Sequence, residues 1–379
     1  MVNVTKILKR SWHILWNYRM LWVFGFILAL TVGGNTFNRG GGTNNNNNNR
    51  DNGNQNQPFN FHPENDWRGL QGNTPREKLD DAFRQAGTAI QKLQAQHPTE
   101  FRMVIAVAIT ALVMLIILGI IGAILRYIAE TAAIRMVDEY EQTGVKVGFR
   151  QGWKYGWSRA AWKLFLINFI VHIPALVLFV ILGLVGWWIA SAALSGVEST
   201  LITSLIAGVG LAFIAILVTV VLMVVLLLLR DFAWRITTLE GNGVMESLRM
   251  AAAMVRRNWK SAGLMWLVMI GIKIAWGLVF LILIIPLLIV SVLTALGGVV
   301  AAAVPTLLTA GIASLLAAPD YWPWIFAAII GLPFFFVVAF SPILLVGGWG
   351  KIYETSTWTL TYREMKALET VTPTAIEAQ

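Results

Sequence analysis

Long uncharged apolar runs dominate the pattern of this chain. About 20 consecutive apolar residues form a helix that is as long as the hydrocarbon core of a bilayer is thick. The predicted spans are Met20–Gly33, Met103–Leu125, Leu164–Ala190, Leu201–Leu229, Leu264–Leu296 and Trp322–Val346. The first is the shortest and needs flanking residues or a thinned bilayer to cross, and we expect it to be a retained anchor. The pattern predicts an all-α polytopic membrane protein with six transmembrane helices.

A further apolar segment, residues 297–318, separates the fifth and sixth spans. It carries no charge and contains Pro305. It is long enough for a seventh span, or it forms a re-entrant or interfacial hairpin. A seventh span would place the C-terminal tail with Lys351 and Arg363 outside, so we favour the hairpin.

A short basic stretch precedes the first, third and fifth spans. In the first stretch Ile7, Leu8 and Leu15 fall on one helical face, with basic residues opposite. This spacing predicts an amphipathic helix at the membrane interface, where its cations favour anionic headgroups. The expected headgroup contacts are Lys6, Lys9, Arg10, Arg150, Lys154, Arg256 and Lys260. The fold is thus predicted as three helical hairpins, each preceded by a cytoplasmic amphipathic helix.

Composition and charge support this interpretation. Hydrophobic residues make up 57% of the chain and charged residues 13%, against about 45–50% and about 25% in soluble proteins. Of the 29 lysines and arginines, 20 lie in the termini and loops that six spans place inside. This is the positive-inside pattern, so the basic charge needs no nucleic acid partner. We expect an integral protein of a prokaryotic plasma (inner) membrane with both termini cytoplasmic.

The only long polar segment is residues 34–100, which the topology places outside. Its first part is rich in Asn and Gly, as in disordered chains. Thr74-Pro75-Arg76-Glu77 then forms a capping box, which predicts a helix over 75–96. Its apolar stripe has heptad-like spacing and consists of Leu79, Phe83, Ala86, Ile90 and Leu93. The stripe packs on the chain itself or the bilayer, or it contacts a partner.

The predicted organisation has four parts. Residues 1–33 hold the first amphipathic helix and span, and 34–100 form the outer insert. Residues 101–350 form the membrane bundle with spans two to six, and 351–379 form a cytoplasmic tail.

Few residues suggest chemistry. The chain has no cysteine and four histidines, and we find no motif for a nucleophile, a phosphate loop, a cofactor or a metal. Lys273 in the fifth span and His172 in the third are the intramembrane polar candidates. An ionisable group inside a span marks a functional site, unless it reaches the interface, as Lys273 could by snorkelling. We expect His172 to be structural.

The segments Arg235–Arg249 and Val255–Trp259, and the closing Thr355–Arg363, resemble the glycerophosphoryl diester phosphodiesterase membrane-domain family. The resemblance implies a helical bundle and covers the membrane part but not the insert. In that family the phosphodiesterase chemistry belongs to a separate barrel with a His-Arg pair, which this chain lacks. The resemblance therefore carries no phosphodiesterase activity.

Two functions remain open. The first is a non-enzymatic membrane scaffold or accessory subunit that engages anionic lipid and protein partners, as a homo-oligomer or as a subunit of a larger complex. The alternative is a transporter or lipid-handling protein with a cavity near Lys273 and the 297–318 hairpin. A weaker third possibility is an enzyme acting on lipid.

Overall fold

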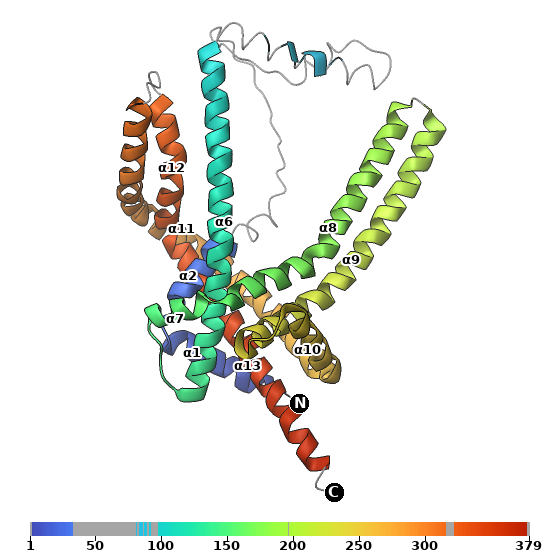
Figure 1. Cartoon of the computed structure of the whole chain (residues 1–379), viewed down its shortest axis with the longest axis vertical. Helices are drawn as coiled ribbons and strands as arrows, with labels where there is room; N and C mark the ends of the chain where they lie inside the picture. The colour runs from blue at the N-terminus through green and yellow to red at the C-terminus, as the bar shows by residue number, and fades with distance from the viewer. Residues whose placement is uncertain are drawn as a thin grey trace. The chain divides into compact units, whose positions relative to one another are not determined.

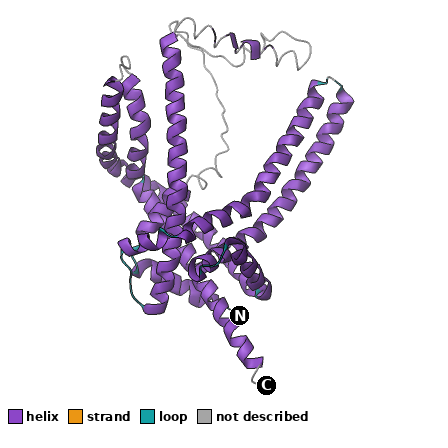
Figure 2. Cartoon of the chain, viewed as in Figure 1, coloured by secondary structure: helices purple, strands orange, loops and turns teal. Residues whose placement is uncertain are grey.

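The fold is known from a computed structural model, which describes residues 2–32, several positions between 81 and 91, and residues 98–195, 197–315 and 322–376. Within these ranges all regular structure is helical, as Figure 2 shows. In chain order (Figure 1) the helices are α1 (Val4–Asn17), α2 (Leu21–Val32), α6 (Pro98–Thr143), α7 (Phe149–Gly156), α8 (Arg159–Leu194), α9 (Glu198–Glu240), α10 (Val244–Arg257), α11 (Trp259–Leu315), α12 (Trp322–Ala339) and α13 (Ser341–Ile376). The all-α prediction is confirmed for this part of the chain.

The number of helices that could cross a membrane is five or six. Among the described residues, α6, α8, α9, α11 and α12 are each long and apolar enough to do so. α1 and α2 pass the same criterion only as a pair, and they are bent by 100° at the break between them. α2 alone has 12 residues, about 18 Å at about 1.5 Å per residue. The predicted first span is therefore the one that a single helix does not form, in line with its short length in the sequence.

The segment that we expected to form a hairpin is part of one helix. α11 runs for 57 residues and includes everything from position 297 to Leu315. Pro286 and Pro305 both lie inside it, because the helices around a membrane helix can satisfy the backbone groups that a proline frees. The hairpin over 297–318 is thus wrong as far as the described residues reach, because one helix continues through this segment.

α11 and α12 pack closely as an antiparallel pair. The Thr294 hydroxyl donates to the carbonyl oxygen of Ala339 at 2.7 Å. Further along, a Cβ atom on Gly298 would lie 2.9 Å from the carbonyl oxygen of Phe335. Small residues let helix backbones approach in this way where lipid supplies no hydrophobic driving force.

The chain falls into two compact units. The first comprises Met1–Asn38, Val107–Ile173 and Leu222–Gln379, and the second comprises Arg39–Ala106 and Pro174–Val221. In the second unit, α8 and α9 pair through Gly208, where a Cβ atom would lie 2.9 Å from the side chain of Ile189. The candidate site lies entirely within the first unit.

The first unit repeats one arrangement of short and long helices. Three short helices, α1, α7 and α10, each directly precede an apolar helix, and we call them the leading helices. α6, α9 and α13 each end a helical pair, and we call them the returning helices. α6 and α9 both stop at a glycine with positive φ, Gly144 at 71° and Gly241 at 79°. This left-handed C-terminal stop is a position that glycine occupies at the least steric cost.

The returning helices form the core of the first unit. The hydroxyl of Thr355 on α13 donates to Glu130 on α6, and Arg363 on α13 pairs with Asp138 on α6. Both contacts join residues 225 positions apart, so α6 and α13 run parallel. α9 lies along the same core, because Arg235 pairs with Glu130 and Lys366 pairs with Glu240.

α2 completes this core by crossing α13 at a glycine contact. A Cβ atom on Gly25 would lie 2.6 Å from the carbonyl oxygen of Gly348. The two backbones therefore touch, and neither position has room for a side chain. The same crossing buries Phe24 and Leu28 of α2 in the apolar core.

Candidate functional site

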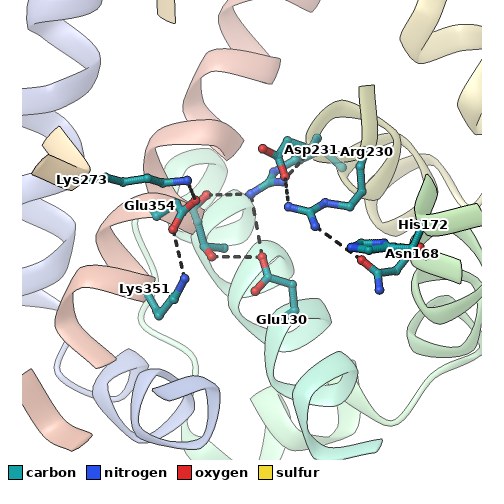
Figure 3. Close-up of polar contacts among 10 residues, drawn as sticks. Glu130, Asn168, His172, Arg230, Asp231, Lys273, Lys351 and Glu354 are labelled. Carbon is teal, nitrogen blue, oxygen red and sulfur yellow. Dashed lines mark hydrogen bonds and ion pairs between the residues drawn. The ribbon is translucent and has the colours of Figure 1, made fainter. Parts of the chain in front are cut away.

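Five helices bring polar and charged side chains together in the first unit (Figure 3). The set, which we call the inner charge cluster, consists of Glu130, Asn168, His172, Arg230, Asp231, Arg235, Lys273, Lys351, Glu354 and Thr355. It draws on α6, α8, α9, α11 and α13. Four side chains are basic and three are carboxylates, so the cations are largely compensated within the cluster.

The deepest member is Arg235. Its side chain is only 2% exposed, and Nη2 lies 3.9 Å from Oε1 of Glu130. Its other contacts are to backbone oxygens, with Nη1 donating to Asp231 at 2.6 Å and Nη2 to Thr355 at 3.5 Å. The Thr355 hydroxyl donates to the same Glu130 oxygen at 3.0 Å. Arg235 therefore joins all three returning helices.

Glu354 is the centre of the second half of the cluster. Its Oε1 lies 2.6 Å from Nζ of Lys273, and its Oε2 lies 3.5 Å from Nζ of Lys351. Burial alone would raise the pKa of Glu354, but the two lysines outweigh burial and lower that pKa to about 2. The carboxylate therefore stays ionised and ties α11 to α13.

His172 and Arg230 occupy the α8 side of the cluster. Nδ1 of His172 donates to the backbone oxygen of Asn168 at 2.7 Å. Arg230 donates from Nη1 to the side-chain oxygen of Asn168 at 3.4 Å and from Nη2 to Asp231 at 3.2 Å. Its guanidinium also lies 4.7 Å from the ring centre of Trp234. His172 thus hydrogen-bonds within its own helix, and its structural role stays a prediction.

A second group of charges lies where α6 and α9 end beside α13. This exit cluster consists of Asp138, Glu240, Tyr362, Arg363 and Lys366. It lines a pocket of about 270 Å³. The Tyr362 hydroxyl donates to Glu240, and burial together with that carboxylate raises the pKa of Tyr362 well above its usual range. Lys366 pairs with the same carboxylate at 2.6 Å.

A third feature is a groove along α1, which we call the α1 groove. It has a volume of about 680 Å³ and is lined by Lys6, Lys9, Arg10, His13 and Glu141, with polar residues at the start of α1. Nε of Arg10 lies 2.6 Å from Oε1 of Glu141, so the only carboxylate in the lining is already paired.

The structure places the expected headgroup residues as follows. Lys6, Lys9 and Arg10 come together in the α1 groove. The side chains at the other expected positions are exposed on or beside the other two leading helices, and these are Arg150, Lys154, Arg256 and Lys260. The described residues thus place a basic group on each leading helix. The contact with lipid stays a prediction.

The outer stripe is described at one position only. Phe83 is helical and 70% exposed, so the chain itself does not cover this side chain. Four stripe side chains lie outside the described residues: Leu79, Ala86, Ile90 and Leu93. The internal packing that we considered is therefore absent at Phe83, and the partner contact stays a prediction.

Sequence reasoning found Lys273 but missed its partner. We assigned Glu354 and Glu130 to segments beyond the spans and so treated Lys273 as an isolated charge. One sequence feature could have indicated these carboxylates. The pair Glu-Thr occurs at Glu130-Thr131 and again at Glu354-Thr355. Among the described residues, no group of three or more His, Cys, Asp or Glu side chains is placed to hold a metal ion.

These features define a class, an all-helical protein with several helices suited to span a membrane. Within it, the chain belongs to the DUF7544 family, a family of unknown function, whose model matches residues 10–355. The comparisons with curated proteins and with solved structures give no match. Nothing in them links the chain to the glycerophosphoryl diester phosphodiesterase membrane domain, so that resemblance stays an expectation from the sequence.

Proposed function

We propose that this protein is a non-enzymatic membrane scaffold or accessory subunit that engages anionic lipid and protein partners. It resides in a prokaryotic plasma membrane, with both termini and all three leading helices on the cytoplasmic side. The positive-inside distribution of lysine and arginine supports this orientation.

The observation that carries the proposal is the shared surface of the leading helices. Each carries, or is followed within two residues by, an exposed tryptophan near basic side chains: Trp12 in α1 is 48% exposed, Trp157 after α7 66% and Trp259 after α10 65%. Tryptophan favours the interface because its ring is apolar while its N–H stays hydrated, and cations beside it attract anionic headgroups. Nζ of Lys260 lies 5.9 Å from the ring centre of Trp259. Three such sites on one compact unit suit a protein that is held at, and organises, an anionic surface.

The inner charge cluster supports a scaffold through its rigidity. The ion pairs join α6, α9, α11 and α13 and hold them in register, since a displacement at Arg235 would leave a buried charge uncompensated. The transporter alternative places a cavity near Lys273 and the 297–318 hairpin. The pairing of Lys273 with Glu354 at 2.6 Å gives that lysine a structural role, so we keep transport as the second candidate only.

The test is native mass spectrometry of the full chain after mild detergent extraction. We expect retained anionic lipid and a mass that exceeds one chain, from a partner or a second copy. A bare monomer that retains no lipid would contradict the proposal. Substrate-dependent flux after reconstitution in liposomes would favour the transporter instead.

The partner contact has its own test at the outer stripe. Replacing Phe83 and Ile90 by Ser should release a partner or dissociate an oligomer while the monomer keeps its thermal stability. A Gln85→Ser variant, on the same helix but outside the stripe, should leave assembly unchanged. An assembly that survives the double substitution would remove the outer stripe from the scaffold.

A further inference from the structure

We infer that the α1 groove is a binding site for the phosphate of an anionic glycerophospholipid in the cytoplasmic leaflet. The inference deepens the proposed function, because it assigns one lipid to one site instead of general attraction to a surface. It rests on the charge balance of the groove, on the helix that carries it and on the tryptophans beside it.

The charge balance leaves two lysines for a ligand. Arg10 is committed to Glu141 at 2.6 Å, and its guanidinium also lies 5.7 Å from the ring centre of Tyr140. Lys6 and Lys9 are exposed, and within the described part of the chain neither forms an ion pair. The pair of Arg10 and Glu141 thus holds α1 in place while the two lysines face the groove without a counter-ion.

The helix geometry places these lysines together. Residues three and four apart lie on one side of a helix, so Lys6, Lys9 and His13 follow one line along α1. The opposite side buries Ile7 and Ile14 in the core, which prevents α1 from turning its cations away. The groove also opens on Thr5 near the first turn of α1, where the helix dipole favours an anion.

The tryptophans indicate a lipid as the source of the phosphate. Trp12 and Trp16 continue the same line beyond Lys9, and they are 48% and 41% exposed. Each is supported on one side by a ring of α13: Trp12 lies 6.1 Å from Tyr353, and Trp16 lies 5.4 Å from Trp349 between ring centres. Half-exposed indole rings on the helix that carries the basic groove suit a ligand with a charged head and an apolar remainder.

The experiment compares full-length variants by native mass spectrometry with titrated phosphatidylglycerol, and with phosphatidylcholine as the zwitterionic lipid. Lys6→Gln with Lys9→Gln should weaken phosphatidylglycerol binding about 30-fold, since each lysine near an anionic headgroup contributes about 1 kcal/mol. Phosphatidylcholine binding should not change. The matched control, Lys146→Gln with Arg249→Gln, removes the same charge from exposed positions outside the groove and should keep the native affinity.

A gain-of-affinity variant separates the site from a folding defect. Glu141→Gln removes the carboxylate from the groove lining and frees Arg10, so phosphatidylglycerol should bind about fivefold more tightly. A misfolded protein would not gain affinity. Inorganic phosphate is the competing probe, and at millimolar concentration it should not displace the lipid.

The possible failures are distinct. Unchanged affinity in the Lys6 and Lys9 variant, or an equal loss in the control, overturns the site. Displacement by inorganic phosphate also overturns it, since the occupant would then be a soluble phosphate. If Arg150→Gln with Lys154→Gln loses the lipid while the groove variant keeps it, the site fails but the proposed function stands. If the native protein retains no anionic lipid, both fail.

Discussion

Removing the charge of Glu130 tests whether the inner charge cluster holds the returning helices together. Glu130→Gln keeps the shape of the side chain and can still accept the hydrogen bond from Thr355. It leaves Arg235, which is 2% exposed, without its nearest carboxylate. Arg235→Met removes the other partner, and the double variant removes both charges.

The magnitude follows from the geometry. At 3.9 Å and an effective dielectric constant of about 20, two unit charges attract by about 4 kcal/mol. Breaking one partner of a buried pair typically costs about 3–5 kcal/mol, because the remaining charge is uncompensated. We therefore expect Glu130→Gln to lower the free energy of unfolding by about 3 kcal/mol, and the double variant to lose less than the sum of the single variants.

The assay is denaturant unfolding of the full chain in micelles, followed by tryptophan fluorescence. The control is Arg257→Gln, which removes a pair with Glu369 at 3.1 Å whose arginine is 66% exposed. Such exposed pairs contribute about 0–1 kcal/mol. The reasoning is refuted if Glu130→Gln costs no more than this control, or if the double variant equals the sum of the single variants.

Three further predictions concern acid, packing and topology. Because the pKa of Glu354 is lowered to about 2 from an ordinary value of 4.5, its stabilisation is complete above about pH 4.5 and is lost as the pH falls toward 2. Glu354→Gln should therefore weaken the dependence of the free energy of unfolding on pH in this range. An unchanged pH dependence would contradict the prediction. Gly25→Val should lower the unfolding temperature because its Cβ atom would lie 2.6 Å from the Gly348 oxygen, whereas Gly277→Ala, in open space, should not. Cysteine at Asn46, in a chain without cysteine, should react with an impermeant thiol reagent on intact cells, and protection there would invert the topology.

The sequence alone determined which segments are helical and which can span a membrane. The spacing of apolar residues and their hydropathy are properties of short segments. The long apolar runs and the leading helices can therefore be recognised without the tertiary structure. The shortness of Met20–Gly33 was also visible in the sequence, and α2 with its 12 residues meets the length criterion for a span only together with α1. The same local signals did not show that one helix continues through the segment after the fifth predicted span. The hairpin at 297–318 was preferred because a seventh span would place the basic C-terminal tail outside, yet α11 continues through this segment to Leu315.

Only the tertiary structure decided which charges meet. Lys273 and Glu354 are 81 positions apart, and Arg235 and Glu130 are 105 apart, so their pairing depends on how α6, α9, α11 and α13 pack. The α1 groove depends both on the sequence spacing and on the packing of the helices. The line of Lys6 and Lys9 is a property of helical spacing, but the pairing of Arg10 with Glu141 on α6 requires the folded chain. A charge pattern shows which residues are available, and packing decides which of them remain free to bind.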